Sequence, residues 1–408
     1  MSTRKKTRQY GARTRPNSLS PSWSKTPPSS PANSPTANSP NQDFESSRKV
    51  KLAAIHQALQ ADPVDVAGLR KLAISKGGLL TDELRRRAWP KLLNVNIYHI
   101  PSKSRGDIED HRDHMQVVLD VNRSLKRFPK GMSDQQREVL QTQLVDVIVR
   151  VLMRHPQLHY YQGYHDIVVT FLLVVGKDLS YALVDQLSTH HLRDFMDSTM
   201  DRTKHMLNYL FPIINKANPQ LHDFMQRSEV GTVFALAWLI TWYGHVLNDF
   251  RSVVRLYDFF LACHPLMPVY LAAAIVLHRE KEVLAEECDM PYIHSLLSKI
   301  PEDLPMEQLV IKAGDLFVQY PPSVMAKEAK LHYEKIHSMS NHNKFELTTY
   351  NQRPDSVLKQ LKLNHGTPEG ALGSKKSSRI VKVAVWALSA GIGAAALAVL
   401  NTAGEFWQ

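Results

Sequence analysis

Cysteine is almost absent from this chain: only Cys263 and Cys288 occur in 408 residues, and they lie far apart. Two separated thiols exclude a disulfide-built scaffold and a zinc site made of cysteines, and they are typical of a reducing compartment. A glycine-rich phosphate loop is also missing, so we expect the chain to bind no nucleotide by itself. Hairpin signals such as an Asn-Gly pair are absent, which disfavours a β-rich fold.

The sequence also lacks the motifs of metal and nucleophilic catalysis. His155 and His159 are four residues apart, but Pro156 interrupts the helix that they would have to share. No HExxH or GxSxG motif is present, and neither cysteine has a recognisable catalytic setting. We therefore expect no metal, no cofactor of its own and no self-contained reaction.

Positive charge is in excess, with a formal net charge of +11, but much of it lies in the two tails, around Arg4–Arg8 and Lys375–Arg379. Basic tails of this kind more often contact an acidic membrane surface or nothing in particular. A helical nucleic-acid binder would need a recognition motif, which is missing. Nucleic acid is therefore not an expected partner.

The first 47 residues are rich in serine, proline, threonine and asparagine, and we predict that they are disordered. Such a segment buries too little apolar surface to offset the entropy of ordering it. Ser-Pro and Thr-Pro pairs make proline-directed phosphorylation plausible, and a tail without regulation is the alternative. No apolar run follows the basic N-terminus, so we expect no secretory signal peptide.

Long apolar runs are scarce until the C-terminus, where residues 380–400 contain 18 consecutive uncharged positions, Val383–Leu400. As a helix this stretch is about 27 Å long, close to the hydrocarbon thickness of a bilayer. The basic residues before it place the preceding chain in the cytosol. We predict a transmembrane tail anchor with a short lumenal tail at 401–408; a buried terminal helix is the alternative.

Between residues 48 and 323 nearly all patterns are helical, so the predicted fold class is all-α. Asp62, Pro63 and Asp65 resemble a helix start. Ser133 and Gln136 form a capping-box pattern that opens a helix, which should end just before Pro156.

Two segments after residue 230 also carry structural predictions. The apolar run Val233–Val246 is too short for an ordinary membrane span, so it predicts a buried helix, with a second membrane segment as the alternative. Residues 324–379 are expected to hold one more helix, over 324–338, followed by a polar linker.

Two short stretches about 40 residues apart carry the functional signal: VVLDVNRSLKRFP at 117–129 and YYQ at 160–162. On a helix, Asp120 lies beside Arg123. An arginine supplied to another protein stabilises the charge of phosphoryl transfer, and a glutamine can orient the attacking water. Neither motif is specific alone, because DxxR is usually a surface ion pair.

Together, VxxDxxR at 117–123 and YYQGY at 160–164 resemble the two fingerprints of the TBC-domain family, all-helical GTPase-activating proteins for Rab GTPases. LRRRAWPKLL at 84–93 and VVRLYDFFL at 253–261 resemble further family segments. The likeness covers roughly residues 65–320 and extends to a branch of the family anchored in the endoplasmic reticulum.

The resemblance implies that Arg123 is the arginine finger and Gln162 the glutamine finger, with Asp120 and Tyr160 supporting them. It further implies a Rab GTPase in its GTP form as partner, a role in traffic from the endoplasmic reticulum to the Golgi, and a catalytic domain facing the cytosol. GTP and Mg²⁺ would belong to the partner. A non-catalytic Rab-binding or tethering scaffold is the competing function, although a scaffold needs neither finger.

Overall fold

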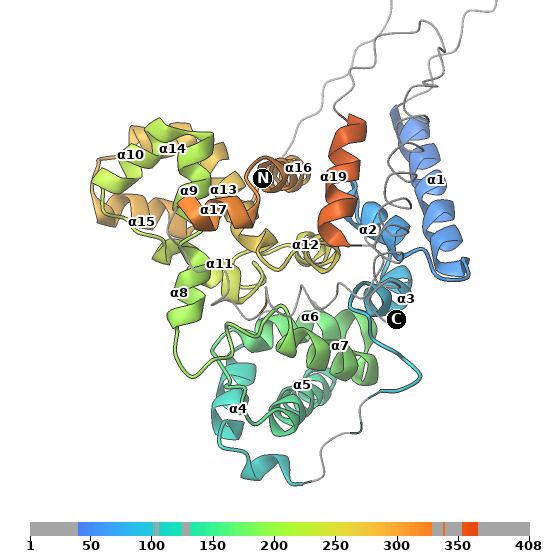
Figure 1. The fold of residues 1–408 in the computed structure, drawn as a ribbon. Coiled ribbons are helices and arrows are strands. Elements are labelled where there is room, and N and C mark those ends of the chain that lie inside the picture. Colours follow the sequence, from blue (N-terminus) through green and yellow to red (C-terminus); the bar gives the residue numbers. More distant parts are fainter. Residues whose placement is uncertain are drawn as a thin grey trace, which may run out of the picture. The chain divides into compact units, whose positions relative to one another are not determined.

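The computed structural model describes residues 40–100, 102, 106–124, 131–328, 338 and 353–365. These residues form α-helices, short 3-10 helices and connecting turns, and no strand occurs among them (Figure 1). The all-α prediction is therefore confirmed. The chain divides after Lys49, and the helical domain lies in the part from Val50 onward.

Most helices in the described residues are short, and turns of a few residues connect many of them. In chain order they are α1 (Pro40–Gln60), α2 (Val66–Ile74), α3 (Asp82–Leu92), η1 (Ile108–Asp110), α4 (His114–Arg123), α5 (Asp134–Arg154), α6 (Tyr164–Val175), α7 (Lys177–Thr189), α8 (Asp201–Leu207), α9 (Leu210–Ala217), α10 (Pro219–Arg227), η3 (Val233–Ala235), α11 (Leu236–Ile240), α12 (Phe250–Ala262), α13 (Met267–His278), α14 (Glu280–Ala285), α15 (Met290–Ser298), α16 (Met306–Gln319), α17 (Pro322–Glu328) and α19 (Pro354–His365).

The helices of the domain form two packed groups that α12 connects. In the first group α5 contacts α4, α6 and α7, and these four helices lie together in Figure 1. In the second group α13 contacts both α9 and α16, and α9 contacts α10. Helix α12 contacts α2, α3 and α16, while α3 also contacts α6. One continuous hydrophobic core runs through both groups.

A buried carboxylate joins α12 to α3. Asp258 is 0% exposed and accepts hydrogen bonds from the Arg85 guanidinium at 3.0 to 3.2 Å and from the Trp89 indole at 2.8 Å. The backbone N–H of Leu79 donates to it as well, at 2.9 Å. Burial lowers the pKa of Arg85, but the charges and hydrogen bonds of Asp258 and Asp82 together outweigh this, so the pKa lies above its ordinary value. The motif segments at 84–93 and 253–261 thus meet in the core.

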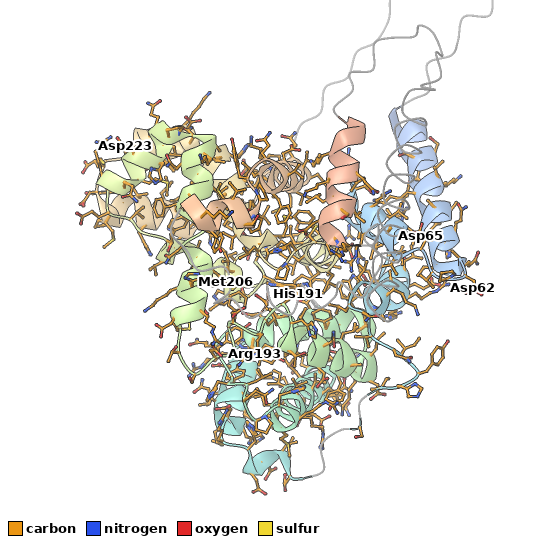
Figure 2. All side chains as sticks on the ribbon, in the orientation of Figure 1. Asp62, Asp65, His191, Arg193, Met206 and Asp223 are labelled. Carbon is orange, nitrogen blue, oxygen red and sulfur yellow. The ribbon has the colours of Figure 1, made fainter. Side chains whose placement is uncertain are left out.

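Helix starts follow the sequence signals in one case and depart from them in another. The Ser133–Gln136 capping box is formed, and α5 ends at Arg154, as predicted. The start predicted at Asp62 and Pro63 is wrong, because both residues precede α2, which begins at Val66. Figure 2 shows Asp62 between α1 and α2. Asp65 is the N-cap instead, since its carboxylate accepts the Gly68 N–H at 2.8 Å.

The apolar run Val233–Val246 is not one helix, so that prediction is wrong in part. It forms a short 3-10 turn, the five-residue helix α11 and a further turn. Trp242 and Tyr243 in this turn have left-handed φ angles of 46° and 64°, which end the helix. Both side chains are buried, at 1% and 0% exposure, which explains the apolar composition.

Two predicted irregular segments contain helices. Residues 40–47 belong to α1, so the prediction of disorder is wrong for them, and residues 1–39 lie outside the described residues. Within the predicted linker, α19 buries Val357 and Leu358 at 0% and 1% exposure and contacts α2 and α16. A purely polar linker is therefore wrong for 354–365, because these apolar residues complete the core.

The predicted tail anchor at 380–400 lies outside the described residues, as does the tail at 401–408. Among the helices that the structure describes, none combines the length and the apolar composition that crossing a membrane would require. Of the helix predicted at 324–338, α17 covers Pro322–Glu328, and the segment 329–337 is likewise not described.

Candidate functional site

Helix α4 carries the first of the two motifs, and Arg123 is its last residue. The Asp120 side chain is 1% exposed, whereas the Arg123 side chain is 69% exposed. Nη1 of Arg123 lies 3.8 Å from Oδ1 of Asp120, which is an ion pair too long for a hydrogen bond. The arginine is therefore held loosely, and its charged end is accessible to a partner.

The second motif follows the end of α5. His155 is the C-cap of that helix, and α6 begins at Tyr164, so the intervening residues form a loop. We call residues 158–163 the glutamine loop. Gln162 is exposed on this loop, whereas Leu158 at its start is buried. A buried start and an exposed tip let Gln162 project from a fixed base.

Tyr160 connects the two motifs through its hydroxyl group. It donates to Oδ2 of Asp120 at 3.0 Å and lies 3.0 Å from Nδ1 of His165. Because a phenol has one proton, Nδ1 of His165 must donate in turn to the phenol oxygen. Burial, and then the Asp120 charge, raise the pKa of Tyr160, so it stays protonated. Oδ1 of Asp120 accepts from Gln116 at 3.0 Å.

Gly163, directly after Gln162, has a φ of +112°, a conformation that favours glycine. A Cβ atom there would lie 2.9 Å from the γ-methyl carbon of Thr241. The glutamine loop therefore approaches residues 240–245, which we call the α11 turn. Tyr161 donates from its hydroxyl to the carbonyl of Ile240 at 2.9 Å. Glycine is thus required both for its conformation and for this close approach.

Both predicted fingers line one cleft with a volume of about 960 Å³. Arg123 comes from the end of α4 and Gln162 from the glutamine loop, with Asp166 and His245 among the other lining residues. The exposed apolar side chains Met200 and Phe250 line it as well. The cleft thus combines a cation, an amide and apolar surface, which suits the recognition of another protein's anionic site.

Sequence reasoning missed several residues of this site. Gln116 is four positions before Asp120, a helical spacing that indicates a contact but names no function. His165 directly follows the second motif and carries no functional signal in the sequence, yet it contacts Tyr160 and lies 3.9 Å from Asp166. Nothing in the sequence connects His245 with Asp166, because 79 positions separate them.

Comparison with known proteins decides the family. The Rab-GTPase-TBC domain matches residues 82–284. The mouse protein TBC1 domain family member 20 is 61% identical over 370 residues, covering 89% of this chain and 92% of its own length. The chain belongs to the TBC-domain family. The human protein of the same name is 60% identical over the same shares.

More distant members agree with this assignment. The fission yeast GTPase-activating protein gyp10 is 32% identical over 251 residues, which is 60% of this chain and 67% of the yeast protein. The crystal structure of the Ypt/Rab-GAP domain of Gyp1p superposes with a TM-score of 0.52 at 14% identity, over 66% of this chain and 98% of that one. This second likeness supports the TBC fold, and the family resemblance inferred from the motifs is confirmed.

Proposed function

We propose that this TBC-domain protein accelerates GTP hydrolysis by a Rab GTPase, to which it supplies Arg123 and Gln162. The single observation that carries the proposal is that these two side chains, 39 positions apart in sequence, line the same cleft. The names of its relatives agree, since gyp10 is described as a GTPase-activating protein.

The two fingers would act on different parts of the reaction. Hydrolysis spreads negative charge over the transferred phosphoryl group, and an arginine supplied in trans accelerates such reactions by roughly 10³ to 10⁵-fold. The Arg123 side chain, 69% exposed, can reach outward to supply that charge. Gln162, with one amide donor group and one acceptor, can hold the attacking water in line. GTP and Mg²⁺ would come from the Rab.

Asp120 and Tyr160 would support the fingers without touching the nucleotide. Asp120 accepts hydrogen bonds from Tyr160 and Gln116. These donors still stabilise its charge when Arg123 moves toward a partner. Tyr160 in turn fixes the base of the glutamine loop to α4. Groups held in place beforehand lose little entropy during the reaction, which favours catalysis.

The cleft also offers a surface on which a Rab could dock. Met200 and Phe250 are each 37% exposed at its lining. On α4, Met115 and Leu119 precede Arg123 by eight and four positions and are 68% and 44% exposed. Exposed apolar side chains near a charged finger are typical of a protein interface.

We further propose that the protein acts at the endoplasmic reticulum membrane, with its domain in the cytosol, on a Rab of traffic toward the Golgi. The apolar run at 380–400, with basic residues before it, supports the anchor. Protease protection of the full chain in microsomes tests it: a tag after Gln408 should be protected, whereas a tag before Met1 should be digested. Digestion of both tags, or release of the protein by carbonate, would favour the buried terminal helix.

The proposed activity is tested with the full chain in detergent, because α19 lies beyond the motif region and packs on the domain. We would measure single-turnover GTP hydrolysis by a panel of Rabs, beside Arg123→Ala and Gln162→Ala. The expected result is an acceleration of about 10³-fold or more on one or a few Rabs, largely lost in each variant. Binding without acceleration of any Rab would favour the scaffold function instead.

A further inference from the structure

The α11 turn approaches the glutamine loop at Ile240 and Thr241, and it also contacts Asp166 on α6, a contact that the proposed mechanism does not use. Nδ1 of His245 lies 3.2 Å from Oδ2 of Asp166. An ionised carboxylate only accepts hydrogen bonds, so Nδ1 of His245 carries the proton and donates. A charged acceptor makes this one of the stronger kinds of hydrogen bond.

Asp166 connects His245 to the backbone that carries Gln162. It lies in the first turn of α6, three residues after Gly163, and its backbone N–H donates to the Gly163 carbonyl at 3.0 Å. Gly163 is covalently joined to Gln162. His245 therefore acts on the backbone from which Gln162 projects, through one side chain and one helical turn.

The α11 turn is a rigid support for this contact. The left-handed conformation of Trp242 and Tyr243 is unfavourable for residues with a side chain, so the packing must hold it. The Trp242 ring packs edge-on against Tyr257 with centroids 5.3 Å apart, and the Tyr243 hydroxyl donates to the Pro268 carbonyl at 2.8 Å. These contacts bind the turn to α12 and α13.

His245 itself is fixed at its backbone. Its N–H donates to the Thr241 hydroxyl at 3.2 Å, and that hydroxyl donates to the Ala237 carbonyl at 2.7 Å. The imidazole thus starts from a defined position in the turn, although 64% of the side chain is exposed. The Asp166 side chain is only 3% exposed.

Because most of the His245 side chain is exposed, a role in function can be distinguished from a role in stability. Ion pairs with one largely exposed partner contribute little to the free energy of unfolding. We propose that His245, acting through Asp166, is a positioning residue that holds the glutamine loop in the geometry needed for hydrolysis. This inference rests on the proposed function, because it assumes that Gln162 orients water in a Rab.

The test compares His245→Ala with His245→Asn in the full chain, with single-turnover GTP hydrolysis followed at increasing concentrations of the activator. Asparagine has an amide nitrogen at the position of Nδ1, so it retains the donor. We expect the plateau rate to fall about tenfold in His245→Ala and to be largely restored in His245→Asn, because small displacements of a catalytic group are costly. The half-saturating concentration should change less than twofold. His222→Ala on α10, outside the cleft lining, is the matched control.

A second measurement asks whether His245 acts through Gln162. In the Gln162→Ala background, His245→Ala should change the remaining rate by less than twofold, because the side chain that it positions is gone. An additional tenfold loss there would overturn the inference and indicate a direct contact with the partner. An unchanged plateau with a raised half-saturating concentration would overturn it as well.

The inference and the proposed function fail in distinguishable ways. If the wild-type protein accelerates a Rab and His245→Ala does so equally well, only the inference is wrong. If the wild-type protein accelerates none, the proposed function is wrong and the inference falls with it. Melting temperatures of the His245 variants should lie within about 2 °C of the wild type, since an exposed pair adds little stability.

Discussion

Two of the aspartate–arginine pairs in this domain, Arg85–Asp258 and Arg123–Asp120, have opposite geometry. Asp258 and Asp120 are both buried, with side chains 0% and 1% exposed. Arg85 is bound to Asp258 at 3.0 Å and is 10% exposed, whereas Arg123 lies 3.8 Å from Asp120 and is 69% exposed. The carboxylates are thus alike in burial, whereas the arginines differ in exposure and in their distance from the carboxylate.

The two pairs differ in the other groups that donate hydrogen bonds to each carboxylate. Asp258 accepts from Arg85 and Trp89 and from a backbone N–H, so the arginine is an integral part of the core. Asp120 accepts from Tyr160 and Gln116, two neutral donors that satisfy it without the arginine. An arginine that its carboxylate does not need is free to serve a partner, as the proposed role of Arg123 requires.

The largest expected effect on stability is that of Asp258→Ala. It leaves the buried Arg85 charge without its main acceptor, which typically costs about 3 to 5 kcal/mol in the free energy of unfolding. Chemical denaturation of the full chain, followed by tryptophan fluorescence, measures it. Asp82→Ala is the control, since Asp82 is 48% exposed and should cost under about 1 kcal/mol. A loss below about 1 kcal/mol in Asp258→Ala would contradict a structural role.

Tyr160→Phe should have an intermediate effect, because it removes only the hydroxyl that joins Asp120 to His165. We expect the unfolding free energy to fall by about 1 to 3 kcal/mol, since a buried acceptor loses its donor. The plateau rate of Rab activation should fall about tenfold as the glutamine loop loosens. Tyr292→Phe, at a half-exposed position on α15, should change neither quantity. An unaltered rate would show that Asp120 does not need this link.

Arg123→Ala should have the smallest effect on stability, within about 0.5 kcal/mol, because its ion pair is long and exposed. The same variant should lose nearly all activity on a Rab. If Arg123→Ala destabilises the chain as much as Arg85→Ala does, the proposed difference between the two pairs is wrong, since both arginines would then be structural. Denaturation curves of the two variants, recorded side by side, decide this.

Much of the site was predictable because its signals are local. The end of α5 before Pro156 and the helix carrying Asp120 and Arg123 both follow from neighbouring residues. Contacts between distant segments were not predictable from pattern alone. The pairing of Arg85 with Asp258 joins positions 173 apart, and helical periodicity carries no information on such contacts. The buried face of α19 was missed because only a few apolar residues, such as Val357 and Leu358, mark it.

The sequence by itself determined the all-helical class, the capping box of α5 and, by resemblance, the TBC-domain family and its two candidate fingers. Only the tertiary structure decided which arginine is buried, how Tyr160 joins α4 to the glutamine loop, and that the α11 turn reaches Asp166. The physical reason is the range of the interactions. Helix caps and periodicity act over a few residues, whereas burial and side-chain pairing depend on which helices pack together.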